Sequence, residues 1–100
     1  MKLNHSIDQG ELRITLTDDV TFEAYSDFKR VMDMIKDEKL TRITIDMAGV
    51  AFMDSSGLGL LLLVQEEAKK KNIRPRISGA TGQINRLFEL ARFEQYFDFS

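Results

Sequence analysis

Apolar and polar residues alternate near the amino terminus of the chain. In the segment ELRITLT, apolar residues at positions 12, 14 and 16 are separated by Arg13 and Thr15. This two-residue period is typical of a strand that buries one face. The turn-prone pair Gln9-Gly10 separates this segment from LNHSID. Residues 2–17 are therefore predicted to form a β-hairpin with one buried face.

Between residues 20 and 36, apolar residues recur every three or four positions instead of alternating with polar ones. The apolar residues at these steps, with acids and bases between them, are Phe22, Tyr25, Phe28, Val31, Met32 and Ile35. Such a pattern predicts an amphipathic helix. Asp19 and Thr21 are the candidate caps for its start.

The middle of the chain reads as a strand, a loop and a second helix. TRITIDM, residues 41–47, is rich in β-branched residues and predicts a central strand. Its end is expected to open into a loop over residues 48–53. A helix is predicted from Ser55 to about Lys71, because its terminal lysines suit the negative end of the helix dipole.

The last third of the chain predicts a strand, a helix and an aromatic tail. Pro75 in IRPRISG indicates an edge strand or an irregular strand start, since proline has no N–H for the ladder. A helix is predicted after Gly79 through residue 91, and the aromatics of FEQYFDFS are expected to close the core in a last turn or strand. The order β-β-α-β-α-β-α predicts one α/β domain over residues 1–100.

Composition narrows the possible functions. The chain has 100 residues, 43% of them hydrophobic and 30% charged, which is the profile of a globular protein. Its net charge of −2 provides no basic field for nucleic acid. There is no cysteine, and the single histidine, His5, cannot form a histidine-based metal cluster.

The hydrophobic runs are too short for a membrane segment. The amino terminus lacks an apolar core of signal-peptide length, and the longest apolar run, residues 60–64, is far shorter than a bilayer span. We therefore expect a cytoplasmic protein with no membrane or nucleic-acid partner.

The stretch FMDSSGLGLLLLV, residues 52–64, fails as an enzyme motif. A nucleophile elbow needs glycine two residues before the serine, where Met53 and Asp54 stand instead. A dinucleotide fingerprint fails at Leu62, and no lysine follows as in a phosphate-binding loop. His5 lies in a predicted strand and offers Ser55 no catalytic base. We expect neither enzymatic activity nor a cofactor.

Two uses of this stretch remain open. In the first, Asp54 or Ser55 caps the helix, while Gly57 and Gly59 allow close packing against the sheet. In the second, an exposed serine at the helix start accepts a phosphoryl group, which the free N–H groups and the dipole accommodate. A phosphate adds about −1.5 to −2 charges beside Asp54 and would change a docking surface. The following leucines are too continuous for a one-sided helix, so most should be buried, with Leu58 the exposed contact.

ITIDMAGVAFMDSSGLGLLLL resembles the signature of STAS domains, the family of anti-sigma factor antagonists. The resemblance extends over essentially the whole chain, with ISGATGQINRLFELARFEQYF as the closing helix region. It implies a single STAS domain with a small mixed β-sheet and packed helices. It also implies phosphorylation of Ser55 by a partner anti-sigma factor with serine kinase activity, with Ser56 as the secondary candidate.

The family picture describes a reversible regulator. The unmodified protein binds the anti-sigma factor and releases the sigma factor, the phosphorylated protein does not bind, and a metal-dependent serine phosphatase of the PP2C type restores it. The residues that the resemblance places at the partner interface are Asp54, Ser55, Ser56, Gly57, Leu58 and Thr21.

Two positions depart from the family pattern. Thr21 stands where many members carry aspartate before the first helix, and Ala91-Arg92-Phe93 lacks the glycine often found after the closing helix. The first departure leaves a second interpretation open. This is a STAS regulator of another output, such as biofilm formation, secretion or a signalling complex, controlled by a kinase/phosphatase response regulator.

Overall fold

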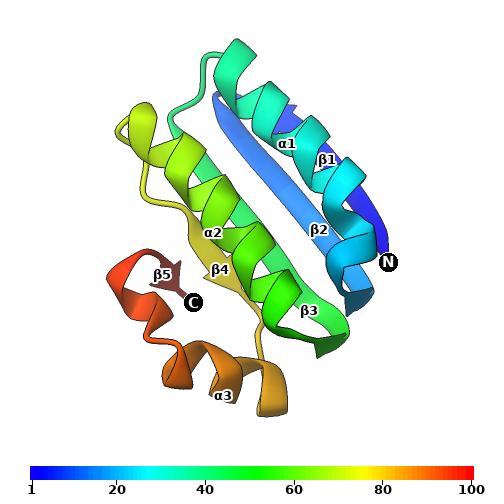
Figure 1. Ribbon diagram of the computed structural model, residues 1–100. Helices are drawn as coiled ribbons and strands as arrows, with labels where there is room; N and C mark the ends of the chain where they lie inside the picture. The colour runs from blue at the N-terminus through cyan, green and yellow to red at the C-terminus, as the bar shows by residue number, and fades with distance from the viewer.

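The alternating segment forms the expected hairpin in the computed structural model, which describes residues 1–100 (Figure 1). Strand β1 (Lys2–Asp8) runs antiparallel to β2 (Glu11–Val20). The turn residues Gln9 and Gly10 have φ values of 50° and 82°, the left-handed conformation that two-residue hairpin turns favour. Residues 12, 14 and 16 are buried, so the prediction of a hairpin with one buried face is confirmed.

Three parallel strands extend the hairpin into a mixed sheet. Strand β3 (Arg42–Met53) lies beside β2, β4 (Arg76–Ser78) lies beside β3, and β5 (Asp98–Phe99) forms the far edge. The strand order is β1-β2-β3-β4-β5. The α/β architecture with a small mixed sheet is therefore confirmed, and the aromatic tail contributes a strand.

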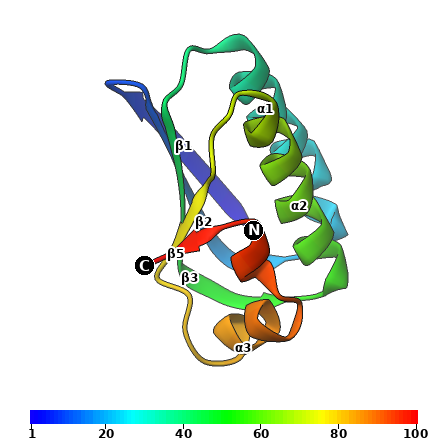
Figure 2. The same ribbon diagram turned by 90° about the vertical axis from the view of Figure 1, so that its left-hand side faces the viewer.

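The two longer helices cover one face of this sheet. Helix α1 (Tyr25–Asp37) follows the 3-10 turn η1 (Phe22–Ala24), and α2 (Ser55–Lys70) packs beside it. Figure 2 shows both on the same side of the sheet, with α3 (Gly82–Leu90) at its lower end and no helix on the opposite face. No helix is long and apolar enough to cross a membrane.

Side chains from the sheet and helices form one hydrophobic core. It contains 23 buried residues, among them Phe28 of α1 and Leu60, Leu61 and Val64 of α2. Burial of most of the leucine run is confirmed. Leu58 is half-buried, and so are Leu62 and Leu63, so Leu58 is not distinguished as an exposed contact.

The loop predicted over residues 48–53 is wrong, because β3 continues to Met53. The pairing of β2 with β3 shifts register twice, between Thr15 and Thr17 and between Asp18 and Asp19. Each bulge adds a residue to β3, so its inward residues Met47, Val50 and Met53 are spaced by three rather than two. Because apolar and polar residues do not alternate over residues 48–53, the sequence pattern did not predict a strand there.

The predicted start of the first helix is also wrong. Strand β2 extends to Val20, and α1 begins only at Tyr25. Thr21 occupies the N-cap position of η1, but neither η1 nor α1 has a side-chain cap hydrogen bond at its start. Asp19 lies within β2 and does not cap. Pairing with the extended end of β3 keeps residues 17–20 in the sheet.

The carboxyl-terminal third is held by aromatic packing and by Arg74. Phe93 and Phe97 are buried and stacked, with ring centroids 5.3 Å apart. The Arg74 guanidinium donates to Asp98 Oδ1 at 2.8 Å and to the backbone carbonyl of Phe97 at 3.0 Å. Pro75 lies before β4, which is an interior strand, so the irregular start is confirmed and the edge position is wrong.

The start of α2 touches the ends of β2 and β3 directly. A Cβ atom on Gly57 would lie 2.5 Å from both Met53 Cγ and the Val20 carbonyl oxygen, whereas one on Gly59 would meet nothing within 4 Å. Two residues along a helix correspond to about 200° of rotation, so Gly59 points to solvent. The expected close packing is confirmed for Gly57 and wrong for Gly59.

This difference predicts opposite effects of the same substitution. Gly57→Ala should lower the free energy of unfolding by about 1–3 kcal/mol, because the added methyl overpacks against backbone. Gly59→Ala should raise it by roughly 0.5–1 kcal/mol through helix propensity. Urea denaturation of both variants measures these changes, and equal effects at the two positions would contradict the packing described here.

Candidate functional site

The site begins where β3 ends and α2 starts. Asp54 is extended, with φ −103° and ψ −174°, and its Oδ1 accepts a hydrogen bond from the Gly57 amide at 3.0 Å. An aspartate in this geometry satisfies one of the free N–H groups of the first turn. Of the two candidate caps, Asp54 and Ser55, it is therefore Asp54 that caps α2.

Ser55 is the first residue of α2, and its side chain faces solvent. The residue is exposed, whereas its neighbour Ser56 is half-buried. Because Asp54 caps the helix, modification of the Ser55 hydroxyl would not remove the cap hydrogen bond. A helix N-terminus carries a positive partial charge and free N–H groups, which favour an anionic group here.

Thr21 joins this site through the neighbouring strand end. It follows Val20, whose carbonyl oxygen lies against Gly57, and η1 contacts α2 directly. Phe22 in the same turn is 67% exposed and stacks on Tyr25, with ring centroids 5.9 Å apart. The structure thus brings Thr21 beside the segment from Asp54 to Gly57, as the resemblance implied.

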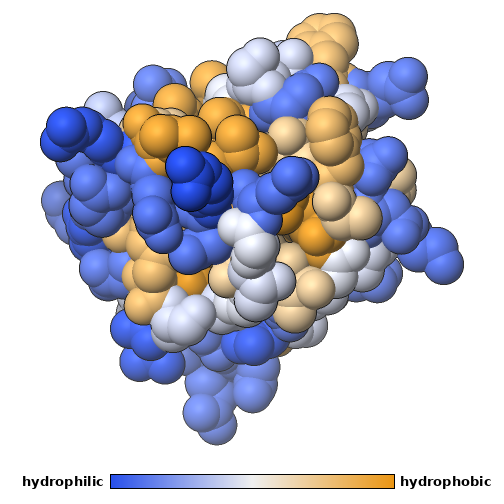
Figure 3. All heavy atoms as spheres, turned by 90° about the horizontal axis from the view of Figure 1, so that it is seen from below, coloured by the Kyte–Doolittle hydropathy of each residue, from blue (hydrophilic) through white to orange (hydrophobic).

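An apolar groove that was not anticipated from the sequence reaches Met53, two residues before Ser55. It has a volume of about 310 Å³ and runs between the end of β3 and α3; its apolar lining comprises Ala51, Phe52, Met53, Ile84, Leu87 and Leu90. Phe52 is 51% exposed and Leu90 is 72% exposed. Figure 3, a view of this end of the molecule, shows apolar surface interrupted by hydrophilic side chains. We call this surface the Phe52–Leu90 groove.

The groove was missed because residues 48–53 did not read as a strand. The two bulges turn Val50 inward as well as Met47 and Met53, so the alternation that would identify Phe52 as an outward strand residue is lost. Exposed large apolar side chains that share one hollow are typical of surfaces that bind other proteins. The groove therefore extends the candidate site beyond the DSSG segment.

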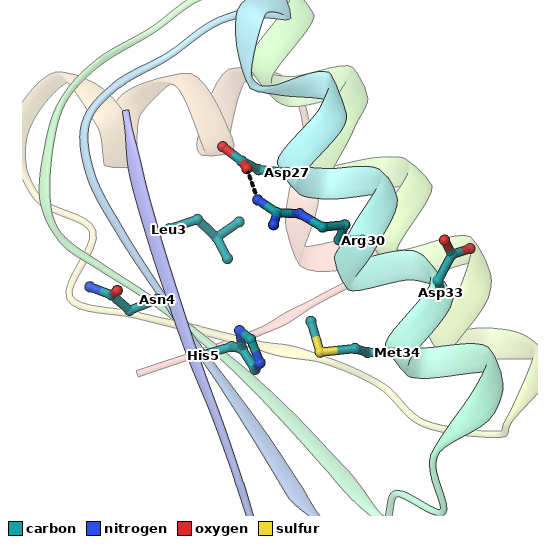
Figure 4. Close-up of a pocket in the computed structure, with 7 residues that line it drawn as sticks. All are labelled: Leu3, Asn4, His5, Asp27, Arg30, Asp33 and Met34. Carbon is teal, nitrogen blue, oxygen red and sulfur yellow. Dashed lines mark hydrogen bonds and ion pairs between the residues drawn. The ribbon is translucent and has the colours of Figure 1, made fainter.

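His5 lies elsewhere, as expected for a strand residue. Figure 4 shows it on β1, facing α1 across a hollow of about 520 Å³ that is also lined by Asp27, Arg30 and Met34. An ion pair between Arg30 and Asp27 borders this hollow. No group of three or more His, Cys, Asp or Glu side chains is arranged to hold a metal ion.

The chain is similar to known proteins along nearly its whole length. The STAS domain model matches residues 2–100. A STAS-domain containing protein of Pseudomonas aeruginosa (strain UCBPP-PA14) is 27% identical over 95 residues, which are 95% of this chain and 93% of that protein.

Solved structures share the fold at lower identity. The anti-sigma factor antagonist SpoIIAA in its unphosphorylated form matches with a TM-score of 0.80 and 19% identity, over 99% of this chain and 87% of SpoIIAA. The phosphorylated form of SpoIIAA from Bacillus matches with a TM-score of 0.78 and 18% identity, over 99% of this chain and 91% of that one.

The same fold also occurs inside a much larger protein. The murine anion transporter Slc26a9 matches with a TM-score of 0.75 and 17% identity, over 90% of this chain but only 16% of the transporter. Fold alone thus accompanies different functions, whereas the family model covers nearly every residue of this chain. The chain belongs to the STAS domain family.

Proposed function

We propose that this protein is a phosphorylation-controlled regulator of the anti-sigma factor antagonist type. Its unmodified form binds an anti-sigma factor or related serine kinase in the cytoplasm. Phosphoryl transfer to Ser55 abolishes binding, and a PP2C-type phosphatase reverses it. The protein acts as substrate and docking partner and needs no cofactor. The observation that carries the proposal is an exposed serine at the start of α2 beside the Phe52–Leu90 groove.

Accessibility favours Ser55 over Ser56 as the acceptor. A kinase must reach the hydroxyl oxygen and align it with the transferred phosphoryl group. Ser55 is exposed, while Ser56 is half-buried behind it. Asp54 holds the backbone of the first turn through Gly57, so the hydroxyl is presented on a rigid support.

A phosphate at Ser55 would change docking without unfolding the domain. It adds about −1.5 to −2 charges, which is comparable to the whole net charge of −2. The free N–H groups of the first turn accommodate it, so the fold is retained. A partner that buries the adjacent groove would have to remove water from a dianion, which is strongly unfavourable without a matching cation.

The two solved forms of SpoIIAA support this reasoning. The structures of its unphosphorylated and phosphorylated forms match this chain with TM-scores of 0.80 and 0.78. A STAS fold of that protein is thus observed in both states. By analogy, we infer that phosphorylation here alters the surface charge of a domain whose architecture stays unchanged.

The alternative interpretation keeps the serine and changes the partner. Thr21 adjoins the site where many family members carry aspartate, so the partner surface differs locally from theirs. A STAS regulator of biofilm formation, secretion or a signalling complex would use the same site. The identity of the captured partner distinguishes these outputs.

If Ser55 accepts the phosphoryl group, partner binding should depend on whether Ser55 is phosphorylated. We expect the native chain and Ser55→Ala to retain a serine kinase of the anti-sigma factor type from a lysate of the producing cells. The chain with phosphoserine incorporated at position 55 should not retain it, because the dianion opposes burial of the groove. Mass spectrometry of the captured proteins and of the phosphorylated peptide identifies both partner and acceptor.

Phosphoserine at position 6 is the control. Ser6 is also exposed but lies on β1, the edge strand away from the groove, so it adds the same charge outside the proposed interface and should leave kinase binding intact. If all forms retain the same kinase, partner binding does not depend on phosphorylation of Ser55 and the proposed function is refuted. Phosphate found at Ser56 alone would move the acceptor by one residue and contradict the assignment.

The groove predicts a second binding determinant. Leu90→Ser should weaken binding of the captured partner at least tenfold, because it removes an apolar contact worth about 1.5–3 kcal/mol when fully buried. The free energy of unfolding should change little, since Leu90 is 72% exposed. Isothermal titration and urea denaturation measure the two quantities.

Ile7→Ser serves as the control for this experiment. Ile7 is also a solvent-accessible aliphatic residue, 41% exposed, but it lies on β1 away from the groove. Its substitution should leave partner affinity unchanged. Equal affinities of the Leu90 and Ile7 variants would exclude the groove from the interface.

A further inference from the structure

The face of the sheet without helices carries a cluster of arginines. Figure 2 shows this face turned away from α1 and α2. A hollow of about 380 Å³ with no hydrophobic lining residue lies on the sheet; it is lined by Glu11, Arg13, Arg42, Thr44, Arg76, Ser78 and Ser100. We call this surface the arginine face.

Strand register brings the three arginines together. Arg13 on β2 pairs with Thr44 on β3, which in turn pairs with Arg76 on β4. Neighbouring strands are about 4.8 Å apart, so the outer two Cα atoms are separated by roughly 10 Å. Arg42 precedes Thr44 by two residues and therefore lies on the same face. The guanidinium groups thus surround one central threonine.

The charges of this cluster are not neutralised by the protein. The ion pairs of the structure involve other cations, namely Arg30, Lys36, Lys70 and Arg74. None of the three clustered guanidiniums has a carboxylate oxygen within 4.0 Å. The carboxylate of Glu11 instead accepts the hydroxyl hydrogen of Thr44 at 2.9 Å. Three arginines and one acidic side chain, that of Glu11, line the hollow together with Thr44, Ser78 and Ser100, so a bound anion would relieve the repulsion between the guanidiniums.

We propose that the arginine face binds a small polyanion with two or more phosphoryl groups. Guanidinium is planar and offers paired N–H donors that match phosphate oxygens. The hydroxyl of Ser78 adds a neutral donor at the rim. Because the hollow has no apolar or aromatic lining, recognition rests on phosphoryl groups and not on a base or an acyl chain.

The hollow is separate from the site at Ser55. Arg42 is the first residue of β3, and Met53, which adjoins the Asp54 cap, is the last. The arginine face therefore lies toward the other end of the strand and on the opposite face from α2. Its ligand would bind independently of phosphorylation, so this inference and the proposed function can fail separately.

Amide chemical shifts of the ¹⁵N-labelled full chain, titrated in phosphate-free buffer, test the proposal. Pyrophosphate and tripolyphosphate should cause saturable shifts centred on Arg13, Thr44 and Arg76. The triple variant Arg13→Gln, Arg42→Gln, Arg76→Gln should bind at least tenfold more weakly. ATP tests the source of the phosphoryl groups, and it should bind as tripolyphosphate does.

A charge-matched variant separates site binding from general attraction. Lys29, Lys39 and Lys69 are exposed and lie outside the sheet, and their triple replacement by glutamine removes the same charge. This control should retain binding. Equal weakening in both triple variants, shifts scattered over the surface, or no saturation at millimolar concentration would overturn the proposal. Binding of ATP without binding of tripolyphosphate, or of polyglutamate without pyrophosphate, would overturn it as well.

Discussion

The close contact of Gly57 with the ends of β2 and β3 determines the position of the whole candidate site. Because no side chain separates α2 from the Val20 carbonyl and from Met53, the helix starts directly on the sheet. Asp54 then closes the first turn through its hydrogen bond to Gly57. The consequence is an exposed Ser55 at the start of a helix that contacts η1, two residues after Met53 of the Phe52–Leu90 groove.

The end of β3 gives this site its apolar part. Two bulges turn Val50 inward between Met47 and Met53, and the strand continues to Met53 with Phe52 facing outward. The groove therefore combines a strand end with residues of α3, which lie about thirty positions later in the sequence. An apolar surface close in sequence to an exposed serine is the physical basis of the proposed regulation. Under that proposal, phosphorylation changes the surface charge and leaves the fold unchanged.

Local patterns predicted much of the fold. The hairpin, the second helix and the cap near Asp54 depend on residues close in sequence, and the family motif identified the same segment. The loop over residues 48–53, the early start of the first helix and the packing of Gly59 were predicted wrongly, since each depends on how β2 pairs with β3 or which side of α2 faces the sheet. The arginine face could not be found from sequence alone, because only the parallel register brings Arg13, Arg42 and Arg76 together. Arg92, just after α3, adopts the left-handed conformation with φ 56°, in which glycine is usually favoured at the end of a helix.

The most direct test of the account is a comparison of ¹H–¹⁵N correlation spectra of the unmodified chain and the chain with phosphoserine at position 55. Both states should give the spectrum of a fully folded domain. Shift changes should be confined to the start of α2, the turn η1 and the Phe52–Leu90 groove. Changes that reach core residues such as Ile14 and Ile45, or a loss of signal dispersion, would show that the phosphate disrupts the fold and would contradict a local change of surface charge.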